Sequence, residues 1–341
     1  HAVNISAGAQ ALISSKEYDA GSGYNTANDF YQTLDYVEDG SESFYGYIDE
    51  WNWMNLYAHG DYTWKSLIRT SLNVAVDGSS SSGTGAERYG IFPSAGVTFI
   101  AKNLRGLANS SFLNRMDLRA EYGLTGNSRF SSNYGKNYYH SAQFQTLSGI
   151  VRSNIPNTRL KWEETRQLDL GIDLTLLRNR LDLSLNYFNA KSDDVLFAQP
   201  VSSVFGTSDY YVNTAQIDNE GLEVSMEVAL VQRKNVGWSI GGNISTSKSR
   251  IVSLGTMNEK VTTFSDGAQV ITRVGGKPYS FYGYMVEGVF ASSDEAARSG
   301  LSNWRGDAYQ AGDLHFRDRN GDKVIDDEDK QIIGSAAPDF F

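Results

Sequence analysis

Residues 166–187 have the sequence RQLDLGIDLTLLRNRLDLSLNY, in which apolar and polar side chains alternate strictly in two runs. Side chains in a β-strand point to opposite faces with a period of two, so each run has one apolar face and one polar face. A tight turn at Arg178–Arg180 separates the runs, which predicts an antiparallel hairpin. The apolar positions are Leu168, Leu170, Ile172 and Leu174 in the first run and Leu181, Leu183, Leu185 and Tyr187 in the second.

The polar face of this hairpin carries carboxylates well inside the strands, at Asp169, Asp173 and Asp182. A soluble sheet with one face in water can have this pattern. A transmembrane barrel can have it too, with lipid outside and a wet lumen inside. The class of protein therefore depends on which solvent the leucines face.

Further strands are predicted by the same alternation. They lie at Tyr62–Val76, Ala95–Ala101, Arg115–Gly123, Leu222–Val228 and Trp238–Ile244, with a turn at Gln232–Asn235 before the last. The first is longer than the usual strand of about 5–6 residues and suits a tilted membrane strand of about 9–11. Arg115, Asp117, Arg119 and Glu121 share one face of the third strand, which favours a polar lumen.

Stretches rich in Gly, Ser, Asn and Tyr separate these strands and are expected to be long, outward-facing loops. They cover residues 1–50, 124–157, 200–215, 255–275 and 292–313, with short strands starting at Val3 and near Tyr138–Thr146. Loop aromatics such as Tyr210, Tyr211 and Tyr309 either contact a ligand or a lid protein, or simply order the loops.

The composition of the chain excludes several classes of protein. The 341 residues have a mean hydropathy of −0.40, and no run of about 18 apolar residues predicts a membrane helix, although barrel strands escape that test. A net charge of −10 without a basic cluster argues against nucleic acid as a partner. The absence of cysteine removes disulfides, thiolate catalysis and a lipid-anchored Cys. No signal peptide follows His1, so an exported protein would have its N-terminus elsewhere.

Residues 318–329, DRNGDKVIDDED, match a twelve-residue calcium loop. Positions 1, 3, 5, 7, 9 and 12 are Asp318, Asn320, Asp322, Val324 (through its backbone carbonyl), Asp326 and Asp329. The loop departs from the pattern because Gly321 is at position 4, Lys323 replaces the usual glycine at position 6, and the last ligand is Asp rather than Glu. We expect a structural calcium site rather than a regulatory sensor; the alternative is an acidic surface turn.

Catalytic motifs are missing. The sequence has no G-x-S-x-G, H-E-x-x-H, G-x-x-x-x-G-K-[ST] or G-x-G-x-x-G pattern, and its four histidines share no ligand spacing. A carboxylate pair for glycoside hydrolysis meets only in three dimensions, so that possibility stays open at this stage. Lumen-facing polar positions explain the strand carboxylates more simply, and we expect no enzyme.

Several segments together resemble the SusC/RagA-type TonB-dependent transporters of the Bacteroidota outer membrane, and they occur in that family's order. They are Gly90–Gly96, Leu118–Asn127, Lys161–Glu163, Asn219–Glu223, Ser280–Tyr284 with Glu287–Phe290, Gly312–Asp313 running into the calcium-like loop, and Ile333–Phe340. The resemblance implies an all-β, antiparallel transmembrane barrel of about 22 strands with a plugged lumen. Residues 1–341 would be a C-terminal part of that barrel, with the plug domain, the TonB box and the final strands outside it. Residues 313–333 would form an extracellular insertion.

The resemblance also implies a function and partners. The protein would import oligosaccharides or oligopeptides across the outer membrane, with a SusD-like surface lipoprotein, energy from TonB through the N-terminal part, and lipid and lipopolysaccharide around the barrel. A second reading is a SusC-like barrel that serves as a structural or assembly subunit of a larger outer-membrane complex. A third is a soluble all-β carbohydrate-binding or hydrolytic domain. A TonB box and a SusD-type neighbour would distinguish the first two, and extraction without detergent would indicate the third.

Overall fold

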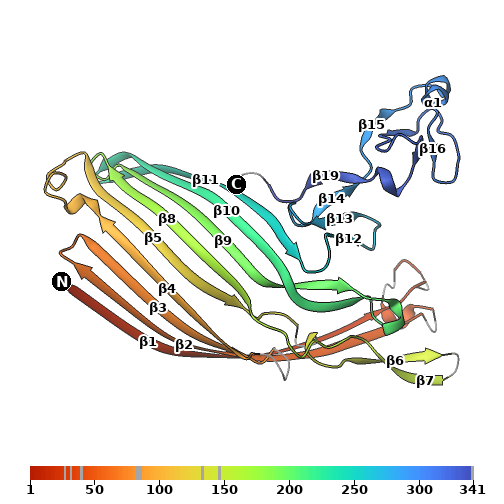
Figure 1. The fold of residues 1–341 in the computed structure, drawn as a ribbon, viewed down its shortest axis with the longest axis horizontal. Helices are drawn as coiled ribbons and strands as arrows, with labels where there is room; N and C mark the ends of the chain where they lie inside the picture. The colour runs from red at the N-terminus through yellow and green to blue at the C-terminus, as the bar shows by residue number, and fades with distance from the viewer. Residues whose placement is uncertain are drawn as a thin grey trace. The chain divides into compact units, whose positions relative to one another are not determined.

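The computed structural model describes residues 1–26, 28–30, 33–38, 41–81, 87–131, 134–144 and 147–338, so Asp339 and Phe340 of the predicted closing segment lie outside the described residues. Nearly all regular structure in these ranges is antiparallel β-strand (Figure 1). The largest sheet has the strand order β1-β2-β3-β4-β5-β8-β9-β10-β11, with β1 and β11 as its edge strands. In the described ranges, no helix is both long enough and apolar enough to span a membrane.

Strands of the large sheet are long. They are β1 (Ala2–Ser22), β2 (Ser43–Trp64), β3 (Ile68–Ser79), β4 (Tyr89–Ile100), β5 (Leu113–Asn127), β8 (Glu163–Leu176), β9 (Leu181–Pro200), β10 (Asp209–Arg233) and β11 (Val236–Leu254). All exceed the common strand length of about 5–6 residues, and all are long enough to cross a bilayer at a tilt.

The chain forms two compact units. Unit 1 comprises His1–Phe99, Glu121–Arg166 and Asp194–Asn213, and unit 2 comprises Ile100–Ala120, Gln167–Asp193 and Thr214–Phe341.

In unit 1, β1 and β2 pair in an unbroken antiparallel register from Ala2↔Thr63 to Ser22↔Ser43. The prediction of a long loop over residues 1–50 is therefore wrong for Ala2–Ser22 and from Ser43 onward, and the strand predicted to start at Val3 is confirmed. The apolar face of β1 ends at Ile13, and beyond that residue the strand continues through its pairing with β2 rather than through an alternation visible in the sequence. β6 (Tyr139–Phe144) and β7 (Leu147–Arg152) form a separate hairpin, which confirms the strand expected near Tyr138.

A turn interrupts the single strand predicted for Tyr62–Val76. β2 ends at Trp64 and β3 begins at Ile68, and the two strands pair with each other from that point. Lys65 and Ser66 have left-handed φ values of 49° and 56°, which reverse the chain. Leu67 also lies in this turn.

In unit 2, both predicted hairpins are confirmed. β8 and β9 are neighbours joined by a turn in which Leu177, Arg178 and Asn179 all have left-handed φ, from 57° to 63°. β10 and β11 pair from Arg233↔Val236 outward, with an irregularity in register between Ala229 and Val231. The bulge inserts Leu230 as an extra residue in β10, bends that strand and shifts the phase of its alternation beyond this point.

The rest of unit 2 contains structure where loops were predicted for residues 255–275 and 292–313, so that prediction is wrong in part. A four-stranded sheet contains β12 (Glu259–Thr263), β13 (Gln269–Arg273), β14 (Ser280–Gly283) and β19 (Gln331–Ser335). Two small pairs are β15 (Val286–Val289) with β17 (Leu314–Phe316) and β16 (Ser302–Asn303) with β18 (Val324–Ile325), and α1 spans Ser293–Ser299. Short 3₁₀ turns lie at Leu34–Tyr36, Ala101–Asn103, Ser203–Phe205 and Asp327–Asp329.

A small hydrophobic core stabilises residues 284–330, which we call the C-terminal module. Phe290, Ala296, Leu301 and Ile325 are buried together, and Tyr284, Tyr309 and Phe316 pack against them. The side chain of Ser292 accepts a hydrogen bond from the Glu295 amide and caps α1. The core joins residues far apart in sequence, which explains why local pattern did not reveal it.

Candidate functional site

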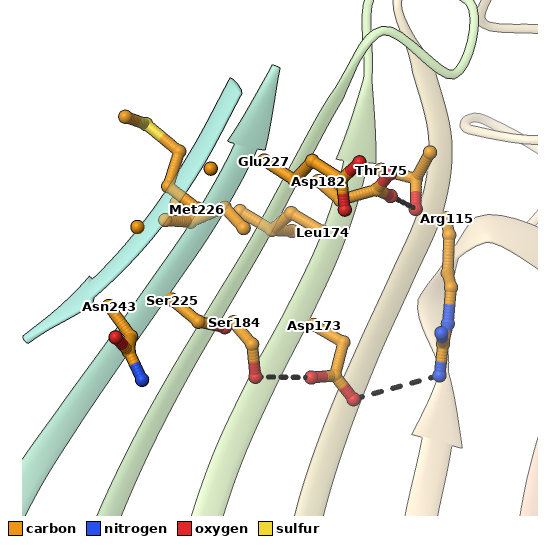
Figure 2. A pocket seen from close by; sticks show the side chains of 13 residues that line it. Arg115, Asp173, Leu174, Thr175, Asp182, Ser184, Ser225, Met226, Glu227 and Asn243 are labelled. Atoms are coloured by element: carbon orange, nitrogen blue, oxygen red, sulfur yellow. Dashed lines mark hydrogen bonds and ion pairs between the residues drawn. The ribbon is translucent and has the colours of Figure 1, made fainter. Parts of the chain in front are cut away.

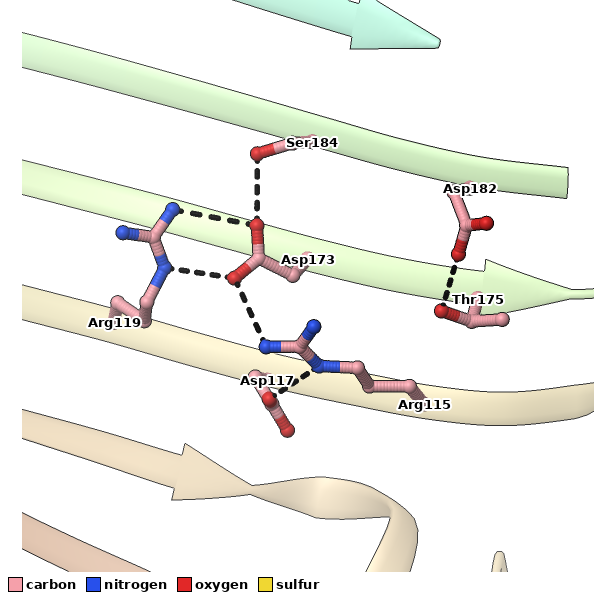
Figure 3. Close-up of polar contacts among 7 residues, drawn as sticks. All are labelled: Arg115, Asp117, Arg119, Asp173, Thr175, Asp182 and Ser184. Atoms are coloured by element: carbon pink, nitrogen blue, oxygen red, sulfur yellow. Dashed lines mark hydrogen bonds and ion pairs between the residues drawn. The ribbon is translucent and has the colours of Figure 1, made fainter. Parts of the chain in front are cut away.

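The polar side chains predicted to share a strand face meet in an ion-pair cluster on β5 and β8 of unit 2 (Figure 3). Arg119 donates from Nε and Nη2 to the two oxygens of Asp173, at 2.8 and 3.3 Å. Arg115 donates to Asp117 at 2.6 Å, and its Nη2 lies 3.6 Å from Asp173. Two guanidinium groups thus balance two carboxylates, which lowers the free energy of holding partly buried charge on this face.

Hydroxyl groups of neighbouring strands extend the cluster. Ser184 on β9 donates to Asp173 at 2.7 Å, and Thr175 on β8 donates to Asp182 on β9 at 2.6 Å (Figure 3). Gly171 lets Arg119 cross the strand, because a Cβ at that position would lie 2.7 Å from the guanidinium. The spacing placed the charges on one face but did not reveal these pairings, since β5 and β8 are neighbours in the sheet although residues 128–162 separate them in the sequence. Glu121, the fourth predicted charge, is exposed.

A hollow of about 500 Å³ opens beside this cluster (Figure 2). Its polar lining comes from five neighbouring strands of the large sheet, β5 and β8 to β11: Arg115, Asp173, Thr175, Asp182, Ser184, Ser225, Glu227 and Asn243. A surface lined by hydroxyl, amide and paired charged groups stays hydrated and offers many weak contacts to a polar solute.

In unit 1 a similar row of polar contacts crosses β2, β3 and β4. The Asn55 amide donates a hydrogen bond to Asp77, and His59 Nδ1 forms a hydrogen bond with the Asn73 side-chain oxygen. The Asn73 amide nitrogen donates to the Ser94 hydroxyl at 3.0 Å. The other ring nitrogen of His59 lies 2.8 Å from Asp61. These residues are partly buried although they are polar.

The opposite face of the same strands is apolar and exposed. Leu72 on β3 is 65% exposed, Leu170 on β8 is 43% exposed and Ile240 on β11 is 58% exposed, whereas Asp117 is only 8% exposed. A soluble sheet would hide the leucines and expose the carboxylates. This inverted arrangement is stable where hydrocarbon covers one face and water or protein covers the other.

The predicted calcium-loop residues come together in the C-terminal module through their own hydrogen bonds. Asp318 accepts from the amides of Gly321 and Lys323, at 2.6 and 2.9 Å, and Lys323 has a left-handed φ of 68°. Asp329 is fully buried and accepts from the amides of Arg319 and Asp326, at 2.7 and 3.0 Å.

The other predicted ligands join the same network. Asn320 accepts from the Asp322 amide at 3.0 Å, Asp322 from the Val324 amide at 2.7 Å, and Asp326 from the Glu328 amide at 2.8 Å. Within the residues that the structure describes, no three His, Asp or Glu side chains are arranged to hold a metal ion by themselves.

Comparison with known proteins gives consistent matches. The family described as TonB dependent receptor-like, beta-barrel matches residues 4–331. TonB-dependent receptor P3 of Formosa agariphila is 30% identical over 308 residues, which are 86% of this chain and 30% of that protein. TonB-dependent receptor SusC of Bacteroides thetaiotaomicron is 26% identical over 274 residues, which are 74% of this chain and 25% of that protein.

Solved structures show the same fold. The RagAB peptide importer in its open-open state superimposes with a TM-score of 0.72 at 20% identity, over 99% of this chain and 36% of that chain. This chain therefore spans about 25–30% of the length of the curated relatives it matches.

Proposed function

Because this chain belongs to the β-barrel family of TonB-dependent receptors, we propose that the protein imports oligosaccharides or oligopeptides with the help of a SusD-like surface lipoprotein. The family is one of outer-membrane proteins, and the large sheet is part of a transmembrane antiparallel barrel. The soluble alternative is therefore wrong. Lipid and lipopolysaccharide would surround the apolar face.

One observation carries this proposal: the large sheet exposes leucine on one face, and on the other it holds largely buried Asp117 and Asp173 in ion pairs with Arg115 and Arg119. This cluster suits a solute pathway, because its two guanidinium groups and two carboxylates neutralise each other. An unpaired charge would bind an ionic solute tightly and retain it, whereas conduction needs contacts weak enough to release the solute.

The proposed mechanism is capture, opening and passage. The lipoprotein would hold the ligand over the barrel, TonB would act through the N-terminal part of the protein to displace a plug, and the ligand would move along the polar wall. No bond in the ligand is made or broken, so the protein is not an enzyme on this account. The wall residues Arg115, Arg119 and Asp173 would keep the path hydrated and the strands in register.

The test is isolation of the native full-length protein from detergent-solubilised outer membranes, followed by identification of bound proteins and of ligand. We expect a stoichiometric SusD-like lipoprotein, and loss of uptake of the bound ligand in cells that lack this protein. Stoichiometric assembly or secretion proteins, with uptake unchanged in the deletion strain, would favour the alternative role as an assembly subunit.

We also propose that residues 313–333 form an extracellular insertion whose loop binds one structural calcium ion. Asp318, Asn320, Asp322 and Asp326 would contribute side-chain oxygens, Val324 its carbonyl and Asp329 the last carboxylate. The left-handed backbone of Lys323 supports this, because position 6 of such a loop needs that conformation and lysine there still adopts it.

Calcium binding predicts that chelation lowers the thermal stability of the full-length protein and that Ca²⁺ restores it more effectively than Mg²⁺. Asp322→Asn together with Asp318→Asn would abolish that response, whereas Asp294→Asn in the same module would retain it. A melting temperature unaffected by chelation would contradict the proposal.

A further inference from the structure

A second hollow, of about 350 Å³, lies in unit 1 between the paired strands β1 and β2 and the segment that follows β5. Its walls combine two cationic side chains, Lys16 and Arg129, with the rings of Tyr47 and Trp51. Asp49, Ser81, Phe130 and Ser131 complete the lining.

The hollow lies on the same face of β2 as the polar contacts of unit 1 described above. Tyr47, Asp49 and Trp51 occur at alternate positions of β2, and the alternation continues to Asn55 and His59. The register between β1 and β2 has no irregularity over this length, so these residues share one face. Asn55 and His59 make the polar contacts with β3 described above. A ligand in the hollow would therefore lie on the polar face of β2.

The charge in the hollow is positive. Lys16 Nζ lies 5.5 Å from the centre of the Tyr47 ring, and the Arg129 guanidinium lies 5.7 Å from the centre of the Trp51 ring. Asp49, the strand partner of Lys16, supplies one carboxylate against these two cations. In a chain with a net charge of −10, this local excess of positive charge favours an anionic ligand.

The aromatic rings of the hollow, held on paired strands, favour a flat ligand that can stack on them. Tyr47 also stacks on Tyr18, with ring centres 5.5 Å apart and planes at 29°. The rings are held by paired strands, so little conformational entropy is lost when a flat ligand stacks there. β1 and β2 use their facing backbone groups to pair with each other, so this wall offers side chains rather than a strand edge to a peptide.

We propose that this hollow binds an anionic saccharide, a pyranose ring that carries a carboxylate or a sulfate group. The ring would stack on Tyr47 or Trp51, and Lys16 and Arg129 would contact the anionic group. The inference deepens the proposed function, since it names the chemical class of an imported ligand.

The test measures binding of defined probes to the detergent-solubilised full-length protein by calorimetry. The probes are an oligogalacturonide, a sulfated galactan oligosaccharide, a neutral cello-oligosaccharide and an acidic hexapeptide. We expect one of the two anionic saccharides to bind at least about tenfold more tightly than the neutral one. The two anionic probes separate the carboxylate from the sulfate.

Lys16→Gln and Arg129→Gln should each weaken binding of the preferred anionic saccharide about tenfold and leave neutral saccharide binding unchanged. Lys65→Gln is the matched control, because Lys65 lies 4.8 Å from the Trp64 ring centre but outside the hollow. This control should bind like the wild type, and all variants should keep the wild-type melting temperature.

Equal binding of neutral and anionic saccharides, tightest binding of the peptide, or glutamine variants that bind like the wild type would each overturn the inference. In the first two cases import of the bound ligand could persist, so the proposed function would stand. Failure of the wild type to bind any probe would overturn the inference as well, and the uptake experiment above would decide the function separately.

Discussion

Asp173 is the centre of the polar cluster, because its two oxygens accept from Arg119 and Ser184 while Arg115 lies nearby. Its side chain is 18% exposed, so its interactions are only partly screened by water. We expect Asp173→Asn to lower the free energy of unfolding of the full-length protein by about 1–3 kcal/mol, since two cations lose a shared partner.

Chemical unfolding in detergent micelles, followed by tryptophan fluorescence, measures this difference. Asp182→Asn is the control, because the amide oxygen can still accept from Thr175. If Asp182→Asn were as destabilising as Asp173→Asn, the ion pairs of Asp173 would not be what stabilises the protein at this cluster.

Lys330 and Asp327 form an ion pair in the C-terminal module, with Nζ 2.7 Å from Oδ1. The hydrogen bond between them raises the pKa of Lys330 above its usual 10.5 and lowers the pKa of Asp327 below its usual 3.8. The Lys330 contribution to stability is therefore complete below pH 10.5 and lost as pH rises through the raised pKa. The Asp327 contribution is complete above pH 3.8 and lost as pH falls through the lowered pKa.

The stability difference between wild type and Lys330→Gln should accordingly be constant between about pH 5 and pH 9 and should shrink outside the window from 3.8 to 10.5. Asp327 is largely exposed, so the pair itself should contribute less than about 1 kcal/mol, as a double-mutant cycle with Asp327→Asn would measure. A difference that varied steeply near pH 7 would contradict this assignment.

At the scale of elements, strands that face lipid on one side and a polar surface on the other were the most predictable. The hairpins around Arg178 and around Lys234 follow directly from the alternation of their residues, because a slip of one position would move every leucine to the polar face. The full length of β1 and the first part of β2 were missed, because the apolar face of β1 ends at Ile13 and that of β2 is interrupted at Glu50 and Asn52. The turn at Lys65–Ser66 was also missed, because neither residue is one that favours a left-handed φ.

The C-terminal module depends on Phe290, which is 1% exposed and packs on Ala296, Leu301 and Ile325. We expect Phe290→Ala to lower the local stability of the module by about 3–5 kcal/mol, through lost burial and the cavity left behind. Hydrogen exchange of the β15 and β17 amides reports this local stability.

A matched control is Phe264→Ala, since Phe264 is 52% exposed. It should leave exchange in β15 and β17 unchanged. Unchanged exchange in Phe290→Ala would show that the buried cluster does not stabilise the module.

At the scale of the whole molecule, the sequence alone predicted the fold class and the polar face but not the pairs on that face. Four charges on β5 could be assigned to one face from their spacing, whereas the pairing of Arg119 with Asp173 depends on which strand follows β5 in the sheet. The hollow between Lys16 and Arg129 escaped prediction for the same reason, because its walls come from segments far apart in sequence. Calcium binding by residues 318–329 stays a prediction.

We infer that lipid covers the apolar face of the large sheet while the opposite face is polar and wet. Single cysteines along β8 test it most directly, since this chain has no cysteine of its own. Gln167→Cys and Asp169→Cys probe one face, and Leu168→Cys, Leu170→Cys and Ile172→Cys probe the other. The full-length variants are placed in lipid vesicles and labelled with a water-soluble maleimide or with a fluorophore that brominated lipid quenches.

We expect alternation with a period of two: thiols at 167 and 169 react from water, and labels at 168, 170 and 172 are quenched by lipid. The reverse phase, or equal reactivity at all five positions, would contradict it.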